Sequence, residues 1–150
     1  HGQIRRQRQM CIRDSAHTPD AYEKVLSSIK NLNKGKINIL FGCGGNRDET
    51  KRATMGAIAD KYSDYLWITP DNPRLEDIDK INNQIINGIK SNHYSSYKDR
   101  GKGLKDALGT LKNDDILIVL GKGRENYQLI KNERIFHSDY EIIMEYINEN

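Results

Sequence analysis

The chain has 150 residues and a mass of 17.3 kDa, a length that predicts about one domain. Charged residues make up 30% of the chain and hydrophobic residues 36%, and the mean hydropathy is −0.80, but isoleucines recur regularly enough to build a core. The longest apolar run, residues 116–120, is too short to span a bilayer, and two cysteines exclude a disulfide-rich scaffold. We therefore expect a soluble, cytoplasmic protein without a membrane partner.

The net charge of +3 comes from the beginning of the chain. Residues 1–13 carry four arginines and no acidic side chain, whereas the other 137 residues carry 20 basic and 21 acidic side chains. Because no basic face is left to follow a phosphate backbone, we expect no nucleic-acid partner. Residues 1–13 also lack hydrophobic periodicity and the apolar stretch of a signal peptide, so we interpret them as foreign or disordered and exclude them from the fold.

Helical and strand patterns alternate from Thr18 onward. Thr18 and Pro19 form the start signal of a helix that ends near residues 33–35. Residues 37–41 form a short apolar run that enters a glycine loop, which indicates a strand. Apolar residues at helical spacing then predict a helix that ends near residue 62.

The second half of the chain continues this alternation. In chain order, we predict a strand over residues 65–69, a helix over 78–89, a short strand over 93–97, a helix over 99–111, a strand over 116–120, a hairpin over 129–136 and a last helix from Ser138. Strands that alternate with helices predict an α/β fold with right-handed crossovers and a mostly parallel sheet. In such sheets, ligands bind at the carboxyl ends of the strands.

Three of the predicted strands end in loops of unusual composition. These loops are GCGGNRD (residues 42–48), TPDNPR (69–74) and GKGREN (121–126). Glycines after a strand let backbone amides approach an anion, but Arg47 stands where a dinucleotide fingerprint needs its last glycine, and the sequence has no G-x-x-x-x-G-K-[ST] phosphate loop. The first loop is therefore either an anion site or a glycine turn without a ligand.

The second and third loops carry groups that suit an amino acid. Pro70 and Pro73 restrict the backbone around an acid and an amide, and Arg74 offers a planar fork for a carboxylate or phosphate. Such a loop can recognise a zwitterionic head group, or it can be a simple β-turn before a helix. In the third loop, Glu125 can accept from a ligand ammonium, or it can belong to an exposed charge pair.

The sequence gives little support to metal or nucleophile chemistry. The four histidines are scattered along the chain, and none lies at metal-ligand spacing. Cys43 follows a predicted strand, but no base accompanies it in the sequence, which argues against a catalytic cysteine. We therefore predict no metal-binding residue and no catalytic residue in this chain.

Several strings recur in the order and spacing of one protein family. DSAHTPDAYEKVL, FGCGGNRDETKRATMGAIA, TPDNPR, GKGRENYQ and FHSD make residues 14–150 similar to the C-terminal domain of the Mur ligases, of the type that adds meso-diaminopimelate. The resemblance implies a Rossmann-like three-layer domain with a mostly parallel sheet of about six strands. It also implies that residues 14–150 are one domain of a larger enzyme, whose N-terminal and central ATP-binding domains are absent here.

The resemblance further implies an ATP-dependent amide ligase of peptidoglycan synthesis. ATP and Mg²⁺ would be bound mainly by the absent central domain, and a UDP-N-acetylmuramoyl-dipeptide would be bound by the absent domains. The complete enzyme would phosphorylate the γ-carboxyl of the D-glutamate, and the amine of meso-diaminopimelate would attack this acyl phosphate and release phosphate. The fragment is expected to be inactive alone.

The contacts that the family makes with meso-diaminopimelate carry over onto the three loops. They are Arg47, Asp71, Asn72, Pro73, Arg74, Gly121 and Glu125. Diaminopimelate differs from lysine by one distal carboxylate, which Arg74 can hold through a charge-assisted hydrogen bond worth about 1.5–3 kcal/mol. Asp71 and Glu125 can receive ammonium groups. Asp14 and His17 match the segment that faces ATP in the family.

Two other functions are compatible with these residues. The same loops would serve a Rossmann-like module that binds a small amino acid without catalysis, and the lysine-adding ligase of the same family is the second alternative. Lysine-adding relatives usually lack an arginine at the position of Arg74, which favours diaminopimelate. The chain departs from the family pattern at Ser15, where tyrosine is usual, and at Arg124, where histidine is common.

Overall fold

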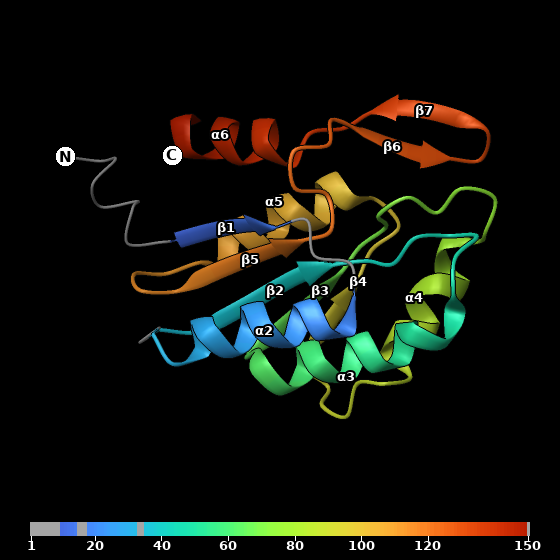
Figure 1. Cartoon of the computed structure of the whole chain (residues 1–150). Helices are drawn as coiled ribbons and strands as arrows, with labels where there is room; N and C mark the ends of the chain where they lie inside the picture. The colour runs from blue at the N-terminus through green and yellow to red at the C-terminus, as the bar shows by residue number, and fades with distance from the viewer. Residues whose placement is uncertain (1–9, 15–17, 33–34, 150) are drawn as a thin grey trace.

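The computed structural model describes residues 10–14, 18–32 and 35–149. In these residues, a parallel sheet lies between helices on both of its faces, and a two-stranded hairpin stands beyond the sheet (Figure 1). The expected α/β class with a Rossmann-like, three-layer arrangement is confirmed.

The elements follow the order that the sequence pattern predicts. The first half contains β1 (Met10–Asp14), α2 (Pro19–Lys30), β2 (Ile37–Phe41), the short 3-10 helix η1 (Glu49–Lys51), α3 (Arg52–Tyr62) and β3 (Tyr65–Ile68). The second half contains α4 (Ile78–Ile86), β4 (Tyr94–Ser96), α5 (Arg100–Thr110), β5 (Ile116–Leu120), β6 (Tyr127–Ile130), β7 (Glu133–Phe136) and α6 (Asp139–Glu149). Each helix and strand predicted from Thr18 onward is present, with ends that differ by a few residues.

Short polar side chains fix where the helices begin. Thr18, Asp77, Asp99 and Ser138 each accept a hydrogen bond of 3.0–3.2 Å from a backbone N–H in the first turn of α2, α4, α5 and α6, respectively. Such a cap satisfies one of the N–H groups that have no partner within the helix and stabilises it by about 1 kcal/mol. The starts of these helices are therefore determined locally, which is why the sequence pattern located them.

All strands of the main sheet run parallel, in the order β1-β5-β2-β3-β4. Ile116 of β5 lies opposite Met10 of β1 on one side and opposite Ile37 of β2 on the other. The expected sheet of about six strands is not confirmed in the described residues, because β6 and β7 form a separate antiparallel hairpin. This hairpin meets the loop after β3 through a bridge between Arg74 and Ile130.

The structure differs from the sequence interpretation at the beginning of the chain. Residues 1–13 were expected to lie outside the fold, but Met10–Asp14 forms β1, which pairs with β5 along five residues. The strand was missed because residues 1–13 lack hydrophobic periodicity, which the backbone pairing of an edge strand does not require. Residues 1–9 lie outside the described part of the chain.

β5 is buried on both faces by two layers of helices. Ile116, Ile118 and Leu120 pack in the cluster that includes α2, α3 and α4, whereas Leu117 and Val119 pack in the cluster that includes α5 and α6. A strand covered on both sides needs apolar residues at every position. The uniformly apolar run that predicted this strand is therefore explained by its central place in the sheet.

The order in which the chain adds strands to the sheet changes direction between β2 and β5, although all of the strands remain parallel. β3 and β4 are added outward from β2, and the chain then returns through α5 to place β5 between β1 and β2 (Figure 1). The helix that follows β2 packs on one face of the sheet, and α6, which follows β5 and the hairpin, packs on the other. Open α/β folds bind ligands at such a switch point, so this fold places the glycine loop and the GKGREN loop where a ligand is expected.

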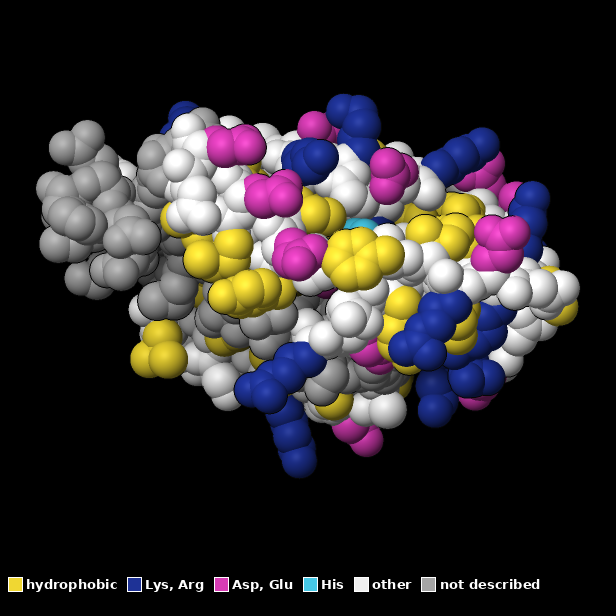
Figure 2. Space-filling view, turned by 90° about the horizontal axis from the view of Figure 1, so that it is seen from above, with side chains coloured by type: hydrophobic (Ala, Val, Ile, Leu, Met, Phe, Trp, Pro, Cys, Tyr) yellow, Lys and Arg dark blue, Asp and Glu magenta, His cyan; other side chains and the backbone are white. Residues whose placement is uncertain are grey.

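The outer surface formed by α6 and the hairpin mixes side chains of all kinds. Figure 2 views this face and shows hydrophobic side chains among acidic and basic ones. Phe136 of β7 is 67% exposed and Tyr140 of α6 is 51% exposed. Within the described residues, no helix combines the length and the apolar character that a membrane crossing requires.

Gly56 marks a close approach between α3 and α4. A Cβ atom at Gly56 would lie 2.2 Å from the backbone carbonyl oxygen of Ile85. We expect Gly56→Ala to lower the free energy of unfolding by about 1–3 kcal/mol, because the two helices must separate to admit the methyl group. Urea denaturation followed by far-UV circular dichroism measures this change.

Gly109 in α5 provides the matched control. A Cβ atom at Gly109 meets nothing within 4 Å, so Gly109→Ala should raise the free energy of unfolding by up to about 1 kcal/mol, through the better helix propensity of alanine. Equal unfolding midpoints for Gly56→Ala and Gly109→Ala would contradict the close packing of α3 on α4.

Candidate functional site

A pocket of about 410 Å³ lies where the loops after β2, β3 and β5 meet. Its walls are formed by Gly42, Cys43, Gly44, Arg47, Asp48, Lys51, Arg52, Met55, Asp71, Asn72, Arg74, Glu125, Tyr127 and Leu129. Five of the seven residues that the resemblance assigns to meso-diaminopimelate are among them, namely Arg47, Asp71, Asn72, Arg74 and Glu125. The structure therefore brings together the three loops that the sequence singled out.

Pro73 and Gly121, the other two assigned residues, support the pocket from behind its walls. A Cβ atom at Gly45 would lie 1.8 Å from the carbonyl oxygen of Pro73, so the glycine loop packs directly on this proline. Gly121 has a φ of 110°, and a Cβ atom there would lie 3.2 Å from Oδ2 of Asp71. Both contacts depend on glycine and let neighbouring loops approach closely enough to share one pocket.

Two arginine side chains converge on Gly44. A Cβ atom at Gly44 would lie 2.9 Å from Nη1 of Arg74 and 3.5 Å from Cγ of Arg47. Nη1 of Arg74 donates to the carbonyl oxygens of Gly45 at 3.0 Å and of Asn72 at 3.3 Å. Neither arginine forms an ion pair with a carboxylate of the described residues. This half of the pocket is therefore electropositive and suits a carboxylate or a phosphate.

The hairpin holds the backbone of Arg74 in an uncommon conformation. The φ of Arg74 is 53°, in the left-handed region, which costs a residue other than glycine about 1 kcal/mol. Its N–H donates to the carbonyl oxygen of Leu129 at 2.8 Å, and its carbonyl oxygen accepts from the N–H of Lys131 at 2.5 Å. These two bonds fix the direction in which the guanidinium leaves the backbone.

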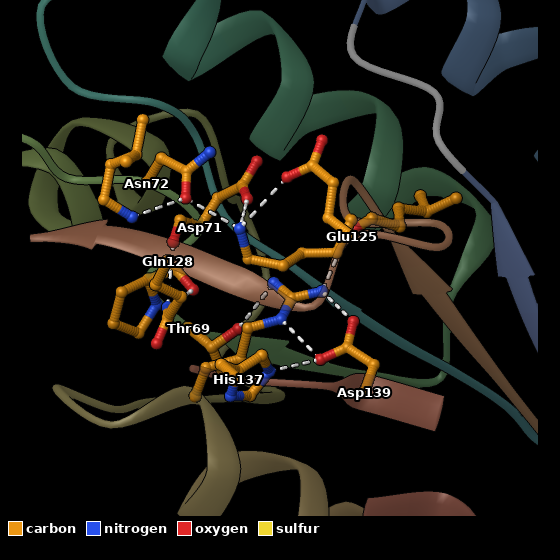
Figure 3. A network of polar contacts seen from close by, with 12 residues as sticks. Thr69, Asp71, Asn72, Glu125, Gln128, His137 and Asp139 are labelled. Atoms are coloured by element: carbon orange, nitrogen blue, oxygen red, sulfur yellow. Dashed lines mark hydrogen bonds and ion pairs between the residues drawn. The ribbon is translucent and has the colours of Figure 1, made fainter. Parts of the chain in front are cut away.

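Lys122 lies at the centre of the acidic half of the site. Its side chain is 0% exposed, and Nζ lies 2.9 Å from Oδ1 of Asp71 and 3.4 Å from Oε1 of Glu125. Nζ also donates to Oδ1 of Asn72 at 2.7 Å, and Figure 3 shows the dashed lines to these three labelled residues meeting at one nitrogen. The two carboxylates that were expected to receive a ligand ammonium already share a lysine ammonium, so a ligand cation would join an existing cluster.

The side chain of Gln128 fixes the loop after β3 to β6. Its Nε2 donates to the carbonyl oxygen of Pro70 at 3.1 Å and to that of Asp71 at 2.8 Å. The backbone N–H of Leu129 donates to Oδ1 of Asn72 at 3.0 Å. The side chain of Asn72 is therefore anchored by Lys122 and by β6 together, which sets the floor of the pocket.

Arg52 connects the glycine loop to the loop after β3. Its side chain is 1% exposed, and it donates to both carboxylate oxygens of Glu76 at 3.0 Å. It also donates to Oε1 of Gln84 at 2.6 Å and to the carbonyl oxygen of Gly44 at 2.8 Å. The hydrogen bonds from Arg52 lower the pKa of Glu76 to about 2. Such a bidentate ion pair is geometrically specific and holds the two loops in one arrangement.

A second buried arginine connects the strand ends to α6. Nε and Nη2 of Arg100 donate to the carboxylate of Asp139 at 3.0 and 2.8 Å, and Nε2 of His137 lies 2.6 Å from the same carboxylate (Figure 3). Arg100 also donates to Oγ1 of Thr69 at 3.3 Å and to the carbonyl oxygen of Leu120 at 3.2 Å. Burial alone would raise the pKa of Asp139, but the charge of Arg100 holds it well below its ordinary value. This network fixes the ends of β3 and β5, from which two of the pocket loops start.

Cys43 lines the pocket but lacks the properties of a nucleophile. Burial raises the pKa of its thiol to about 12, and Sγ lies 3.8 Å from Sδ of Met55. The thiolate form is therefore scarce near neutral pH. This agrees with the sequence argument against a catalytic cysteine.

The residues predicted to face ATP are not placed by the structure. Asp14 is the last residue of β1, but its side chain and all of His17 lie outside the described part of the chain. Within that part, no group of three or more His, Cys, Asp or Glu side chains is arranged to hold a metal ion. The roles of Asp14 and His17 remain predictions.

The sequence did not reveal what Arg52, Lys122 and Gln128 do in the site. The sequence analysis gave Lys122 no role of its own, whereas the structure buries its side chain in the site. One signal could have located it: a cation two residues beyond a strand covered on both faces has little access to water and must find a carboxylate. Nothing in the sequence indicated which carboxylate this would be.

Comparison with known proteins identifies the family of the chain. A family model described as Mur ligase, glutamate ligase domain, matches residues 3–123. The chain belongs to this family. The resemblance inferred from the loop motifs is confirmed, and the pocket described above is a feature of a Mur ligase domain.

The curated relatives of this Mur ligase domain are much longer than the chain. The UDP-N-acetylmuramoyl-L-alanyl-D-glutamate--2,6-diaminopimelate ligase of Rickettsia bellii is 50% identical over 131 residues, which make up 86% of this chain and 28% of the relative. The ligase 1 of the same name from Clostridium acetobutylicum is 44% identical over 138 residues, or 92% of this chain and 29% of the relative. The chain thus spans less than a third of the length of these relatives.

Solved structures share the fold of this Mur ligase domain. A UDP-N-acetylmuramoyl-L-alanyl-D-glutamate--2,6-diaminopimelate ligase superimposes with a TM-score of 0.87 at 35% identity, over 93% of this chain and 29% of its own. The bifunctional folylpolyglutamate synthase/dihydrofolate synthase of Yersinia pestis CO92 superimposes with a TM-score of 0.61 at 21% identity, over 76% of this chain and 26% of its own. The second likeness concerns the fold alone.

The ion pair between Arg52 and Glu76 makes stability depend on pH. Because the folded-state pKa of Glu76 is lowered to about 2, its contribution is complete above the unfolded pKa of about 4.5 and is lost as the pH falls toward 2. We expect Glu76→Gln to lower the free energy of unfolding at neutral pH by about 1–3 kcal/mol, and this deficit should shrink as the pH falls below about 4. Urea denaturation at a series of pH values measures the deficit.

Glu145→Gln, on an exposed position of α6, controls for the general loss of a surface carboxylate. It should change the free energy of unfolding by less than about 0.5 kcal/mol. A deficit of Glu76→Gln that stays constant from neutral pH down to about 3 would show that the ion pair does not stabilise the fold in this way.

Proposed function

We propose that this Mur ligase domain binds meso-diaminopimelate for a cytoplasmic, ATP-dependent ligase that adds it to UDP-N-acetylmuramoyl-L-Ala-D-Glu in peptidoglycan synthesis. The observation that carries the proposal is the composition of one pocket, in which Arg47 and Arg74 face the same space as Asp71 and Glu125. Relatives that bear the name of this reaction support it.

The charge pattern of the pocket matches a zwitterionic head group. An amino-acid head carries a carboxylate and an ammonium on one carbon atom, so it needs a cation and an anion side by side. Arg74 and Arg47 have no carboxylate partner among the described residues, and Asp71 and Glu125 belong to a cluster that can accept further donors. Meso-diaminopimelate has such a head at each end, and one of them can occupy the pocket while the other reacts.

The same pattern opposes lysine. Lysine presents only an ammonium at its distal end, so it would leave the guanidinium of Arg74 without the carboxylate that diaminopimelate supplies. A site that contains a buried or half-buried polar group rejects an analogue lacking the matching group, because that group loses water without gaining a partner. We therefore favour meso-diaminopimelate over lysine as the substrate of this domain.

ATP and Mg²⁺ are assigned to parts of the ligase other than this pocket. The residues that the structure describes offer no cluster suited to a metal ion, so Mg²⁺ would be held by another part of the ligase. When bound elsewhere in the ligase, ATP supplies the phosphoryl group that activates the γ-carboxyl of the D-glutamate. The residues of this domain bind and orient the amino acid whose amine attacks the activated carbonyl carbon, and phosphate leaves.

Arg74→Ala tests the substrate assignment. We expect this substitution to raise the dissociation constant for meso-diaminopimelate at least about tenfold, because the distal carboxylate loses a charge-assisted hydrogen bond, and to change that for L-lysine by less than about twofold. Titration of the ¹⁵N-labelled 150-residue chain with each amino acid, followed by amide chemical shifts, detects even millimolar binding.

Arg124→Ala is the matched control, since Arg124 is an exposed arginine next to Glu125 that does not line the pocket. It should leave both dissociation constants within about twofold of the original values. Equal affinities of the unsubstituted chain for meso-diaminopimelate and lysine, or an Arg74→Ala variant that binds both as before, would refute the assignment.

A further inference from the structure

The cluster around Lys122 lies directly behind the pocket walls. Lys122 does not line the pocket, whereas Asp71, Asn72 and Glu125, which its ammonium contacts through ion pairs or a hydrogen bond, do. They come from two loops, and Lys122 lies at the start of one of them. Its ammonium is therefore placed to control how the carboxylates of both loops face the pocket.

The burial of Lys122 prevents it from moving aside for a ligand. The side chain is 0% exposed, and Nζ also lies 5.7 Å from the ring centroid of Tyr127. An ammonium that leaves this position would lose an ion pair, a charge-assisted hydrogen bond and a cation–π contact, which is a large cost for a buried side chain. A ligand ammonium must therefore bind next to Lys122 and share its carboxylates.

The charge of Lys122 makes this arrangement of carboxylates possible. Asp71 and Glu125 each place an oxygen within 3.4 Å of the same nitrogen. Two carboxylates brought this close without a cation would repel one another, because the effective dielectric constant of a buried site is low. The lysine thus offsets the repulsion, and Oε2 of Glu125 keeps the capacity to accept from another donor.

Asn72 links this charge to the arginine half of the pocket. Its side-chain oxygen accepts from Lys122 at 2.7 Å and from the N–H of Leu129 at 3.0 Å. Its backbone oxygen accepts from the N–H of Gly45 at 2.7 Å and from Arg74 at 3.3 Å. A displacement of Asn72 would therefore move the acidic and the basic groups of the pocket together.

We propose that Lys122 is a positioning residue of the amino-acid pocket: its buried ammonium holds Asp71, Asn72 and Glu125 in one arrangement, in which the carboxylate of Glu125 faces the pocket and receives the ammonium of an amino-acid head group. The inference rests on the proposed function for the identity of the ligand. The arrangement of the loops in the free protein depends on Lys122 whether or not meso-diaminopimelate is that ligand.

Lys122→Ala, combined with chemical rescue, tests this role. Alanine keeps Cβ and removes the atoms that correspond to n-propylammonium. In the 150-residue chain, we expect the dissociation constant for meso-diaminopimelate to rise at least about tenfold, and hydrogen exchange at residues 70–74 and 121–131 to accelerate at least about tenfold, while β2 and β3 stay protected. Added n-propylammonium should reverse both effects, whereas the neutral 1-propanol should not.

Two further variants keep the test decisive. Lys102→Ala is the matched control, because the exposed Lys102 pairs, among the described residues, only with Asp106 of its own helix, and it should change neither readout. Lys122→Met fills nearly the same volume without charge. If Lys122→Ala fails to fold, Lys122→Met should retain the native circular dichroism but show the same loss of binding and of loop protection.

Each outcome separates the two proposals. If the unsubstituted chain does not bind meso-diaminopimelate, the proposed function fails, and hydrogen exchange in the free chain still decides the role of Lys122. If the chain binds meso-diaminopimelate but Lys122→Met binds it equally well with unchanged exchange, the role of Lys122 is refuted and the proposed function stands. Equal rescue by 1-propanol would show that Lys122 only fills space.

Discussion

The parallel direction of all five strands is the constraint on which the site depends. Because β2, β3 and β5 are neighbours or near neighbours that end at the same edge, the three loops that follow them must occupy one region. These loops carry arginine, lysine and carboxylate side chains. If these side chains were brought together without pairing, like charges would repel one another and buried charges would lose water without gaining a partner. Ion pairs and hydrogen bonds between these loops hold the charged side chains in fixed positions around the pocket.

Charge pairing divides the cations of this region into two groups. Arg52, Arg100 and Lys122 are buried, and each is matched to a carboxylate, so they hold loops and strand ends in place. Arg47 and Arg74 have no such partner among the described residues and face the pocket. Burying an ion is costly unless it is paired and hydrogen-bonded, so the paired cations belong to the framework. The unpaired ones retain their capacity to bind an anion.

Features that depend on local sequence could be predicted, and those that depend on distant partners could not. Helix caps such as Thr18 and the apolar run of β5 identified elements correctly, because capping and two-sided burial leave local patterns. Five of the residues that line the pocket followed from the resemblance, since the loop motifs are specific. The strand at Met10–Asp14 was missed because its pairing is made by the backbone, and the burial of Lys122 was missed because its partner Asp71 lies 51 residues away in the chain. The sheet was expected to have about six strands because the family resemblance implied that number, whereas the hairpin predicted from the sequence pattern stands apart from the five-stranded sheet.

The hairpin maintains the left-handed backbone conformation of Arg74. A left-handed conformation at a large side chain is locally unfavourable. It persists here because Leu129 of β6 accepts from the N–H of Arg74, and the N–H of Lys131 donates to the carbonyl oxygen of Arg74. The hairpin contributes little to either hydrophobic core, so its main structural role is to hold the backbone of Arg74 and thereby to orient its guanidinium. Selectivity for an amino acid with a carboxylate at each end would then depend on the β6–β7 hairpin. Lengthening or shortening the turn of this hairpin would change the ligand preference of the pocket without disturbing the sheet.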